Sequence, residues 1–256
     1  NATWTTITGA STPAITGVTT TLLAHVTLFK NRLFFVESSS MRLWYLPVNS
    51  VGGAAAQMDM GSIFRLGGYV MAAYTWTLDA GSGSDDHLVI ISSNGEIAVY
   101  RGSDPSSSTD WAVIGVFTMG RPLGRRCAVK FGGDLAVNTY EGVYPLGKGL
   151  LSSSVDRRVA LTDKIQNSVS QAASTLGSNF GWQVCLNADD NMLILNVPYG
   201  GGANYQYAQN TITGAWTVFS GWDAQVWLKA STGLYYGGST FVNKAWTGNA
   251  DISVPI

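Results

Sequence analysis

The sequence predicts an all-β fold, a β-propeller built from four-stranded blades, on three observations. Thirty glycines in 256 residues, with frequent Ser, Thr and Asn, interrupt any helical period. Hairpins of two apolar runs around a short polar turn recur along the chain. A tryptophan that begins an apolar run also recurs. Repetition of one small antiparallel unit is typical of blades arranged around an axis.

The hairpins begin at residues 25, 87, 127, 182 and 225, so their starts lie 40 to 62 residues apart. A four-stranded blade takes about 40–50 residues, and insertions lengthen it. We therefore predict five blades, with six as the alternative because residues 69–78 can be assigned differently. The expected strand pairs are residues 25–29 with 32–36, 87–91 with 96–100, 127–131 with 134–139, 182–186 with 191–197, and 225–229 with 234–236.

A small or polar lead-in followed by Trp and an apolar run occurs at Trp4, Trp111 and Trp216. The second and third copies fall where the outer, fourth strand of a blade is expected. The first has no hairpin before it, while residues 224–246 supply three strand-like runs and no fourth. We expect residues 4–7 to complete the last blade, because this N-terminal strand closes the ring and removes two unpaired edges. Most of the nine tryptophans are then expected to pack between blades.

One segment departs from the strand pattern. Thr162 is placed to cap the start of a helix, and Gly177 to end it. The apolar stripe is narrow, so we expect this single inserted α-helix, near 162–176, to lie outside the ring or to dock on a neighbouring subunit. Apolar residues fall at helical spacing at Ile165, Val169, Ala172, Ala173 and Leu176.

Charge and hydropathy exclude several functions. The 15 basic and 16 acidic residues give a net charge of −1 and a pI near 6.1, which does not indicate binding to nucleic acid or to an anionic membrane. No run approaches the roughly 18–20 apolar residues of a membrane helix, and the first residues lack the layout of a signal peptide, so no membrane insertion is expected. The 46% apolar content excludes disorder. We expect residues 1–256 to form a single soluble propeller domain, and the missing initiator Met indicates a processed product or a fragment of a longer protein.

Groups that could carry catalysis or bind a metal are few. His25 and His87 each open a strand at matching hairpin positions, where a half-buried histidine bonded to backbone is the expected role rather than a general base. Cys127 and Cys185 lie in apolar runs and are expected as buried free thiols. Two His and two Cys without ligand spacing do not form the tetrahedral set that zinc prefers.

Carboxylates gather at two places. Residues 79–86 form a Gly-rich loop with Asp79, Asp85 and Asp86, which could wrap calcium but lacks the ligand alternation of an EF-hand, so a strand connection is expected. Asp189 and Asp190 resemble a paired-carboxylate hydrolase site, yet they occupy a hairpin turn, where Asp is favoured for its own backbone hydrogen bonding.

Short glycine and serine runs carry no catalytic motif. No GK[ST] or GxGxxG follows the glycines, and no GxSxG accompanies the serines, so both are expected to be turns, bulges or loops. We therefore expect no catalytic residues, no cofactor-binding residues, no metal site and no enzyme. The runs are residues 67–68, 132–133, 200–202 and 237–238 for Gly, and 38–40, 106–108 and 152–154 for Ser.

One stretch has an uneven charge. Residues 121–164 carry eight basic residues against four acidic ones. This excess has two interpretations: a solvated or inter-subunit salt-bridge surface, or a patch that faces passing nucleic acid. The basic residues are Arg121, Arg125, Arg126, Lys130, Lys148, Arg157, Arg158 and Lys164.

Two neighbouring regions carry a family resemblance. The first comprises residues 28–35 (LFKNRLFF) and 41–48 (MRLWYLPV) with GGAA at 52–55. The second comprises DDHLV at 85–89, GEIAVY at 95–100, GSDP at 102–105 and GRPLG at 120–124. These segments resemble those of the tail nozzle proteins (tail tubular protein B type) of short-tailed bacteriophages. The resemblance covers about residues 20–150 well and the remainder loosely.

The resemblance implies a β-propeller module within a larger virion protein, assembled as a ring below the portal and adaptor, through whose lumen the genome leaves. It implies no catalytic residues. The expected function is therefore that of a structural, non-enzymatic component of a phage or prophage tail. Its expected partners are other tail and head–tail adaptor proteins and further copies of itself in a homo-oligomer ring, with DNA only as passing cargo during ejection. The expected location is the virion tail, after the host cytoplasm.

Two other functions are weighed against this one. The alternative is a carbohydrate-binding propeller adhesin, whose exposed Trp44, Tyr45, Tyr205 or Tyr207 would stack on host glycans. A glycan hydrolase is disfavoured, because no carboxylate pair lies in a matching context away from turns.

Overall fold

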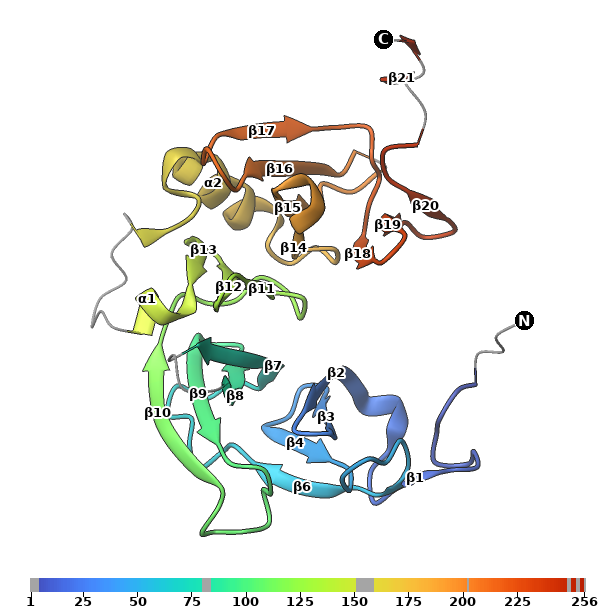
Figure 1. The fold of residues 1–256 in the computed structure, drawn as a ribbon, viewed down its shortest axis with the longest axis vertical. Coiled ribbons are helices and arrows are strands. Elements are labelled where there is room, and N and C mark those ends of the chain that lie inside the picture. The colour runs from blue at the N-terminus through green and yellow to red at the C-terminus, as the bar shows by residue number, and fades with distance from the viewer. Residues whose placement is uncertain are drawn as a thin grey trace. The chain divides into compact units, whose positions relative to one another are not determined.

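The structure, a computed structural model, describes residues 5–79, 84–150, 159–201, 203–247, 250–251 and 254–255. Within these residues, five antiparallel sheets of three or four strands follow one another along the chain, and strands close in sequence pair within each sheet (Figure 1). This is a five-bladed β-propeller arrangement, so the predicted fold class is confirmed. The chain divides into two compact units, Asn1–Pro122 and Leu123–Ile256.

The first unit holds two blades of four strands each. The first blade consists of β2 (Leu23–Phe29), β3 (Arg32–Glu37), β4 (Arg42–Tyr45) and β6 (Ala56–Asp59). The second consists of β7 (Val70–Asp79), β8 (Ser84–Ser92), β9 (Glu96–Arg101) and β10 (Ala112–Thr118). The short strands β1 (Ile15–Thr16) and β5 (Gly53–Ala54) pair in parallel, and a 3₁₀ turn, η1 (Thr20–Leu22), precedes β2. The ambiguous run at 69–78 thus falls in β7, the first strand of the second blade.

Local sequence explains the hairpins of this unit. Lys30 and Asn31 join β2 to β3 with φ angles of 45° and 59°, the left-handed pair of a type I′ turn, whose twist matches that of the strands. The core between the two blades collects buried side chains of both, including Phe34, Leu43 and Leu88. Trp111 packs against this core immediately before β10, the outer strand, as the recurring tryptophan pattern predicts.

Counting only its described residues, the second unit holds three blades, of three, four and three strands. The third blade consists of β11 (Ala128–Phe131), β12 (Asp134–Thr139) and β13 (Gly142–Pro145). The fourth consists of β14 (Gln183–Asn187), β15 (Met192–Val197), β16 (Tyr205–Asn210) and β17 (Trp216–Phe219), and the fifth of β18 (Val226–Ala230), β19 (Gly233–Gly237) and β20 (Val242–Lys244). Shorter elements are α1 (Leu146–Leu150), η4 (Ala188–Asp190), and the pair β21 (Ala250–Asp251) and β22 (Val254–Pro255).

The predicted helix is present, as η3 (Asp163–Ile165) followed by α2 (Gln166–Leu176). Its polar face, with Gln171, Ser174 and Thr175, is exposed, while its apolar stripe packs on strands of its own unit rather than on a neighbouring subunit. Val169, Ala172 and Ala173 are buried in the core that the third and fourth blades share, because these small side chains let the helix lie close to the sheets. The helix therefore stabilises its own unit.

The helix ends directly before Gly177, as predicted, but Thr162 and Gly177 act by other means than those expected. Thr162 makes no side-chain cap, because its buried hydroxyl accepts a hydrogen bond from the Val143 amide at 3.1 Å. Gly177 keeps a right-handed φ of −60°, so it is not a left-handed terminator. A Cβ at this position would lie 2.5 Å from the Ala173 carbonyl oxygen and from the Tyr140 hydroxyl, so the close approach of these two atoms requires glycine.

The predicted closing strand is not found among the described residues. Trp4 lies outside them, and residues 5–8 form no strand. The segment instead folds into a tight loop, in which the Thr8 carbonyl accepts a hydrogen bond from the Ile15 amide at 2.8 Å. Ile7 packs against Ile15, Trp44 and Leu46, so its apolar side chain is covered by the first blade rather than by the last.

Candidate functional site

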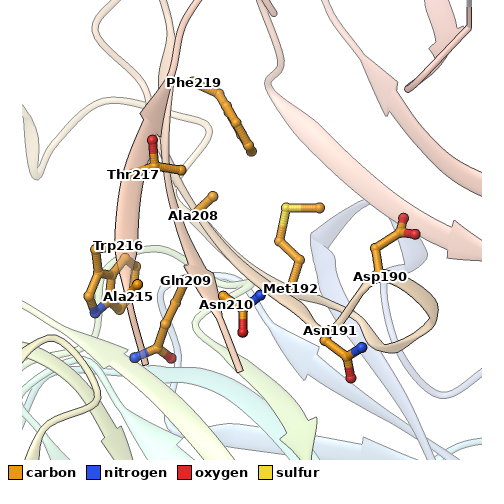
Figure 2. A pocket seen from close by; sticks show the side chains of 10 residues that line it. All are labelled: Asp190, Asn191, Met192, Ala208, Gln209, Asn210, Ala215, Trp216, Thr217 and Phe219. Carbon is orange, nitrogen blue, oxygen red and sulfur yellow. The ribbon is translucent and has the colours of Figure 1, made fainter. Parts of the chain in front are cut away.

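An apolar pocket of about 270 Å³ lies on the fourth blade (Figure 2). Alternation along the strands puts Thr217 and Phe219 of β17 on the same face as Ala208 of β16, which pairs with Thr217. Figure 2 shows the side chains of Met192 and Phe219 pointing toward one another. The rim is polar and includes Asp190, Asn191 and Asn210.

Two further residues that line the pocket, Gln209 and Trp216, fix its strands inside the unit. Trp216 Nε1 and Gln209 Nε2 both donate hydrogen bonds to the Leu161 carbonyl at 3.2 Å. These two bonds hold the outer strand β17 against the segment that precedes α2. The strand that borders the pocket is therefore held in place.

The lining chemistry of this pocket favours apolar contact. Its ten residues include one carboxylate, Asp190, which accepts a hydrogen bond from the Asn187 amide at 2.6 Å. They include no His, Cys or Lys. Such a surface suits apolar side chains of a partner rather than proton transfer.

Two outer strands continue this apolar character to the edges of their sheets. The sequences of β10 (AVIGVFT) and β17 (WTVF) contain no charged residue. Ile114 on β10 is 49% exposed and Val218 on β17 is 56% exposed. In the described part of the chain each strand pairs with one neighbour only. Proteins usually protect such edges with charges, prolines or covering segments, so these uncharged edges are candidate interfaces.

The two histidines make different contacts. The Nε2 atom of half-buried His25 donates to the Ala73 carbonyl at 2.9 Å, as predicted. His87 is buried and its ring packs 6.0 Å from that of Trp76. Its Nδ1 has no hydrogen-bond partner within the described ranges, so the backbone bond expected for this histidine is absent at that nitrogen.

The two cysteines are free and buried, which confirms the prediction. Burial raises the pKa of the Cys185 thiol to about 11, although Lys229 opposes the shift. An unfolded cysteine has a pKa near 8.5, so the thiol stays protonated in the folded protein at pH 8. Since the unfolded chain loses this proton first, the Cys185 contribution to stability is complete below about pH 8.5 and is lost as the pH rises toward 11.

We expect neither thiol of the native protein to react readily with Ellman's reagent at pH 8. The thiolate fraction of Cys185 is roughly a hundredfold below that of an unfolded cysteine, and burial limits access further. Unfolding in urea should release two reactive thiols per chain. A thiol that reacts in the native state at the rate of free cysteine would contradict the burial of these side chains.

The carboxylate candidates have structural roles where they are described. Asp189 and Asp190 lie in the turn η4, as predicted, and Asp189 forms an ion pair with Lys229 at 2.7 Å. In the loop at 79–86, residues 80–83 lie outside the described residues. Asp86 accepts a hydrogen bond from the Thr77 hydroxyl and pairs with Lys30 at 3.6 Å. In the described portion of the chain, no group of three or more His, Cys, Asp or Glu could hold a metal ion.

Most of the described glycine and serine runs lie in turns or loops, but Gly237 is the last residue of strand β19. Residues 67–68 and 200–201 have positive φ angles, as turns at glycine allow. Residues 38–40 lie between β3 and β4, and 106–108 precede β10. Gly202 and residues 152–154 lie outside the described residues.

The aromatic residues expected to stack on glycans are largely internal. Trp44 and Tyr45 are buried, because β4 is a middle strand with neighbours on both sides, and Trp44 donates to Glu37 at 2.7 Å. Tyr207 is buried as well. Burial raises the pKa of half-buried Tyr205, whose ring lies 5.4 Å from that of Tyr207. The expectation that these four residues form an exposed platform is therefore wrong.

Some basic side chains of residues 121–164 make contacts inside the second unit. The guanidinium of half-buried Arg126 donates to the Gln225 carbonyl at 2.8 Å and lies 5.0 Å from the Phe180 ring. Lys164 donates to the Gly214 carbonyl at 3.4 Å. Arg157 and Arg158 lie outside the described residues. A role for the remaining charges beside nucleic acid stays a prediction.

A second, polar pocket was missed by the sequence analysis. It has a volume of about 420 Å³ and is lined by loop residues of the second unit, among them Phe180 and Asp223. These residues are scattered between strands and follow no periodic pattern, so no sequence signal groups them. Only the exposed Phe180 in a polar loop is unusual.

The chain matches no protein-family model and no curated protein. No helix among the described residues is long and apolar enough to span a membrane.

Proposed function

We propose that this chain is a structural, non-enzymatic component of a short-tailed phage tail, a nozzle-type propeller module that assembles with neighbouring proteins around the DNA exit channel. The observation that carries the proposal is the pair of uncharged, exposed outer strands β10 and β17. Monomeric proteins usually protect such strand edges with charges, prolines or covering segments, whereas a permanent assembly buries them in its interfaces.

The positions of the segments that resemble tail nozzle proteins support the same function. Residues 28–35 span the end of β2 and the start of β3, and residues 95–100 cover β9. Phe34 and Tyr100 from these segments lie in the core between the first two blades. The resemblance thus rests on residues that build the propeller, as expected of a family defined by architecture rather than by catalysis.

The partners in this proposal are further copies of the chain in a ring, and other tail and head–tail adaptor proteins. The apolar pocket beside β17 would take an apolar side chain of such a neighbour, since pockets of this kind anchor protein interfaces. DNA passes the assembly as cargo. The protein would be found in the virion tail, after the host cytoplasm.

We expect the double substitution Ile114→Lys and Val116→Lys to weaken assembly without unfolding the protein. Both side chains are exposed on β10, so two added charges would be desolvated only when a partner covers the edge. The apparent dissociation constant of the oligomer, measured by mass photometry and analytical ultracentrifugation, should rise at least about tenfold.

Ile212→Lys is the matched control, because Ile212 is an exposed apolar residue in the turn after β16, outside any strand. It should assemble like the wild type. A wild-type protein that stays monomeric at all concentrations and never associates with an adaptor ring would contradict the proposal.

A further inference from the structure

The polar pocket of the second unit is built by four loops that meet at one end of the fourth and fifth blades. These loops precede β14 and connect β15 to β16, β17 to β18, and β19 to β20. Loops held by rigid sheets are the usual carriers of binding residues. The volume of about 420 Å³ lies within the range of small-molecule sites, about 300–1,000 Å³. The side chains that matter are those of Asn179, Phe180, Asn204, Asp223, Gln225 and Ser239.

Asn204 fixes the wall of this pocket. Its side chain is only 4% exposed, and its Oδ1 accepts a hydrogen bond from the Gly200 amide at 3.1 Å. Its Nδ2 donates to Asp223 Oδ1 at 2.7 Å and to the Ala224 carbonyl at 3.2 Å. The amide thereby ties the β15–β16 loop to the β17–β18 loop and holds the Asp223 carboxylate in one orientation. A ligand would meet a wall that is already ordered.

Several polar atoms of the lining have no partner within the described residues. Asn179 donates through Nδ2 to the Pro198 carbonyl at 2.9 Å, which leaves its Oδ1 available. Asp223 has its second carboxylate oxygen available, since Oδ1 takes the bond from Asn204. Gln225 and Ser239 add an amide and a hydroxyl, and each of these can donate and accept. The pocket therefore offers mixed donors and acceptors from four loops.

An exposed aromatic ring completes the site. Phe180 is 72% exposed, although it lies in the pocket lining. The Arg126 guanidinium lies 5.0 Å from the ring centroid, and Arg126 is itself held by the Gln225 carbonyl. The ring is thus oriented by a contact from within the unit while most of its surface faces water. A large exposed aromatic at the rim of a polar pocket is a stacking surface for a ligand with an apolar face.

We infer that this pocket binds a neutral saccharide, with one sugar ring stacked on Phe180 and its hydroxyls bonded to Asp223, Gln225, Asn179 and Ser239. Sugar hydroxyls both donate and accept, which matches the mixed lining, and one face of a pyranose ring is apolar. No Lys, Arg or His lines the pocket, and Asp223 would repel an anion. A divalent cation takes about six oxygen ligands or more, usually with several carboxylates, which one Asp does not supply.

Binding is tested by saturation-transfer NMR on the whole chain. The panel of neutral saccharides consists of glucose, galactose, mannose, N-acetylglucosamine and oligomers of each. We expect transfer to at least one of them. Phe180→Ala should weaken that binding by about three- to tenfold, the size of an aromatic contact. Gln225→Ala should weaken it as well, because its side chain has no hydrogen-bond partner in the described residues and its removal leaves the fold unchanged.

Ile212→Ala is the matched control, since Ile212 is 75% exposed in the same unit but does not line this pocket. It should bind as the wild type does, and circular dichroism should show all three variants folded. No transfer to any saccharide of the panel by folded wild-type protein would overturn the inference, as would equal binding by the wild type and both pocket variants. The inference does not depend on the tail role, because these measurements do not involve assembly.

Discussion

Replacing Asn196 by Leu is expected to lower the free energy of unfolding of the second unit by about 3–5 kcal/mol. Asn196 lies on β15 and is fully buried between the fourth and fifth blades. Its amide nitrogen donates to the Gly181 carbonyl at 2.8 Å and to the Ala224 carbonyl at 2.9 Å. Its oxygen accepts from Gln206 Nε2 and from Trp227 Nε1, both at 2.9 Å.

The expected cost follows from which partners remain paired. The Ala224 carbonyl keeps a hydrogen bond from Asn204, and Gln206 Nε2 keeps one to the Trp222 carbonyl. The Gly181 carbonyl and Trp227 Nε1 lose the partner that Asn196 supplies. Each polar group that is left buried and unpaired costs about 1–3 kcal/mol.

Urea unfolding followed by tryptophan fluorescence measures this effect. The control is Asn243→Leu on β20, because Asn243 is exposed and its one side-chain hydrogen bond, to Tyr236, is long at 3.5 Å. The control should change stability by less than about 0.5 kcal/mol. If both variants unfold at the same urea concentration, the network around Asn196 does not hold the two blades together.

Phe34→Ala is expected to destabilise the first unit by about 3–5 kcal/mol. Phe34 lies on β3 and is almost fully buried. Its ring lies 6.1 Å from that of Phe29, 5.7 Å from that of Tyr45 and 6.2 Å from that of Trp111. Truncation removes the buried apolar surface of the ring and leaves a cavity among its neighbours. The strands are rigid, so they close this cavity only in part.

Thermal and urea unfolding of this variant should be compared with those of Val26→Ala. Val26 lies on the neighbouring strand β2 but is 55% exposed, so its truncation should cost little. A loss below about 1 kcal/mol for Phe34→Ala would show that the aromatic cluster is not the core of the first two blades.

The hairpins could be predicted because their signals are local. Alternating apolar residues and a turn pair such as Lys30 and Asn31 lie within a dozen residues of one another. The outer strand β10 could be predicted for the same reason, because Trp111 directly precedes it. The positions of residues 4–7 and of the helix near 162–176 could not be predicted in the same way. They depend on which distant surface covers Ile7, and on the Val143 amide, which donates a hydrogen bond to the Thr162 hydroxyl oxygen.

Candidate binding residues were harder to predict than strands. Trp44 and Tyr45 are aromatic residues of a strand, and the sequence does not show that β4 has neighbours on both edges. Phe180 lies in a loop without periodicity, and its partners in the polar pocket come from loops up to about 60 residues away. Exposure of this kind is a property of tertiary packing rather than of local sequence.

The most direct test of the structural role is cryo-electron microscopy of purified phage particles that carry the complete protein with a gold-binding tag. We predict tag density in a symmetric ring of the tail below the adaptor, on the path of the genome. Particles that are complete and infectious yet show no tag density in the tail would contradict it.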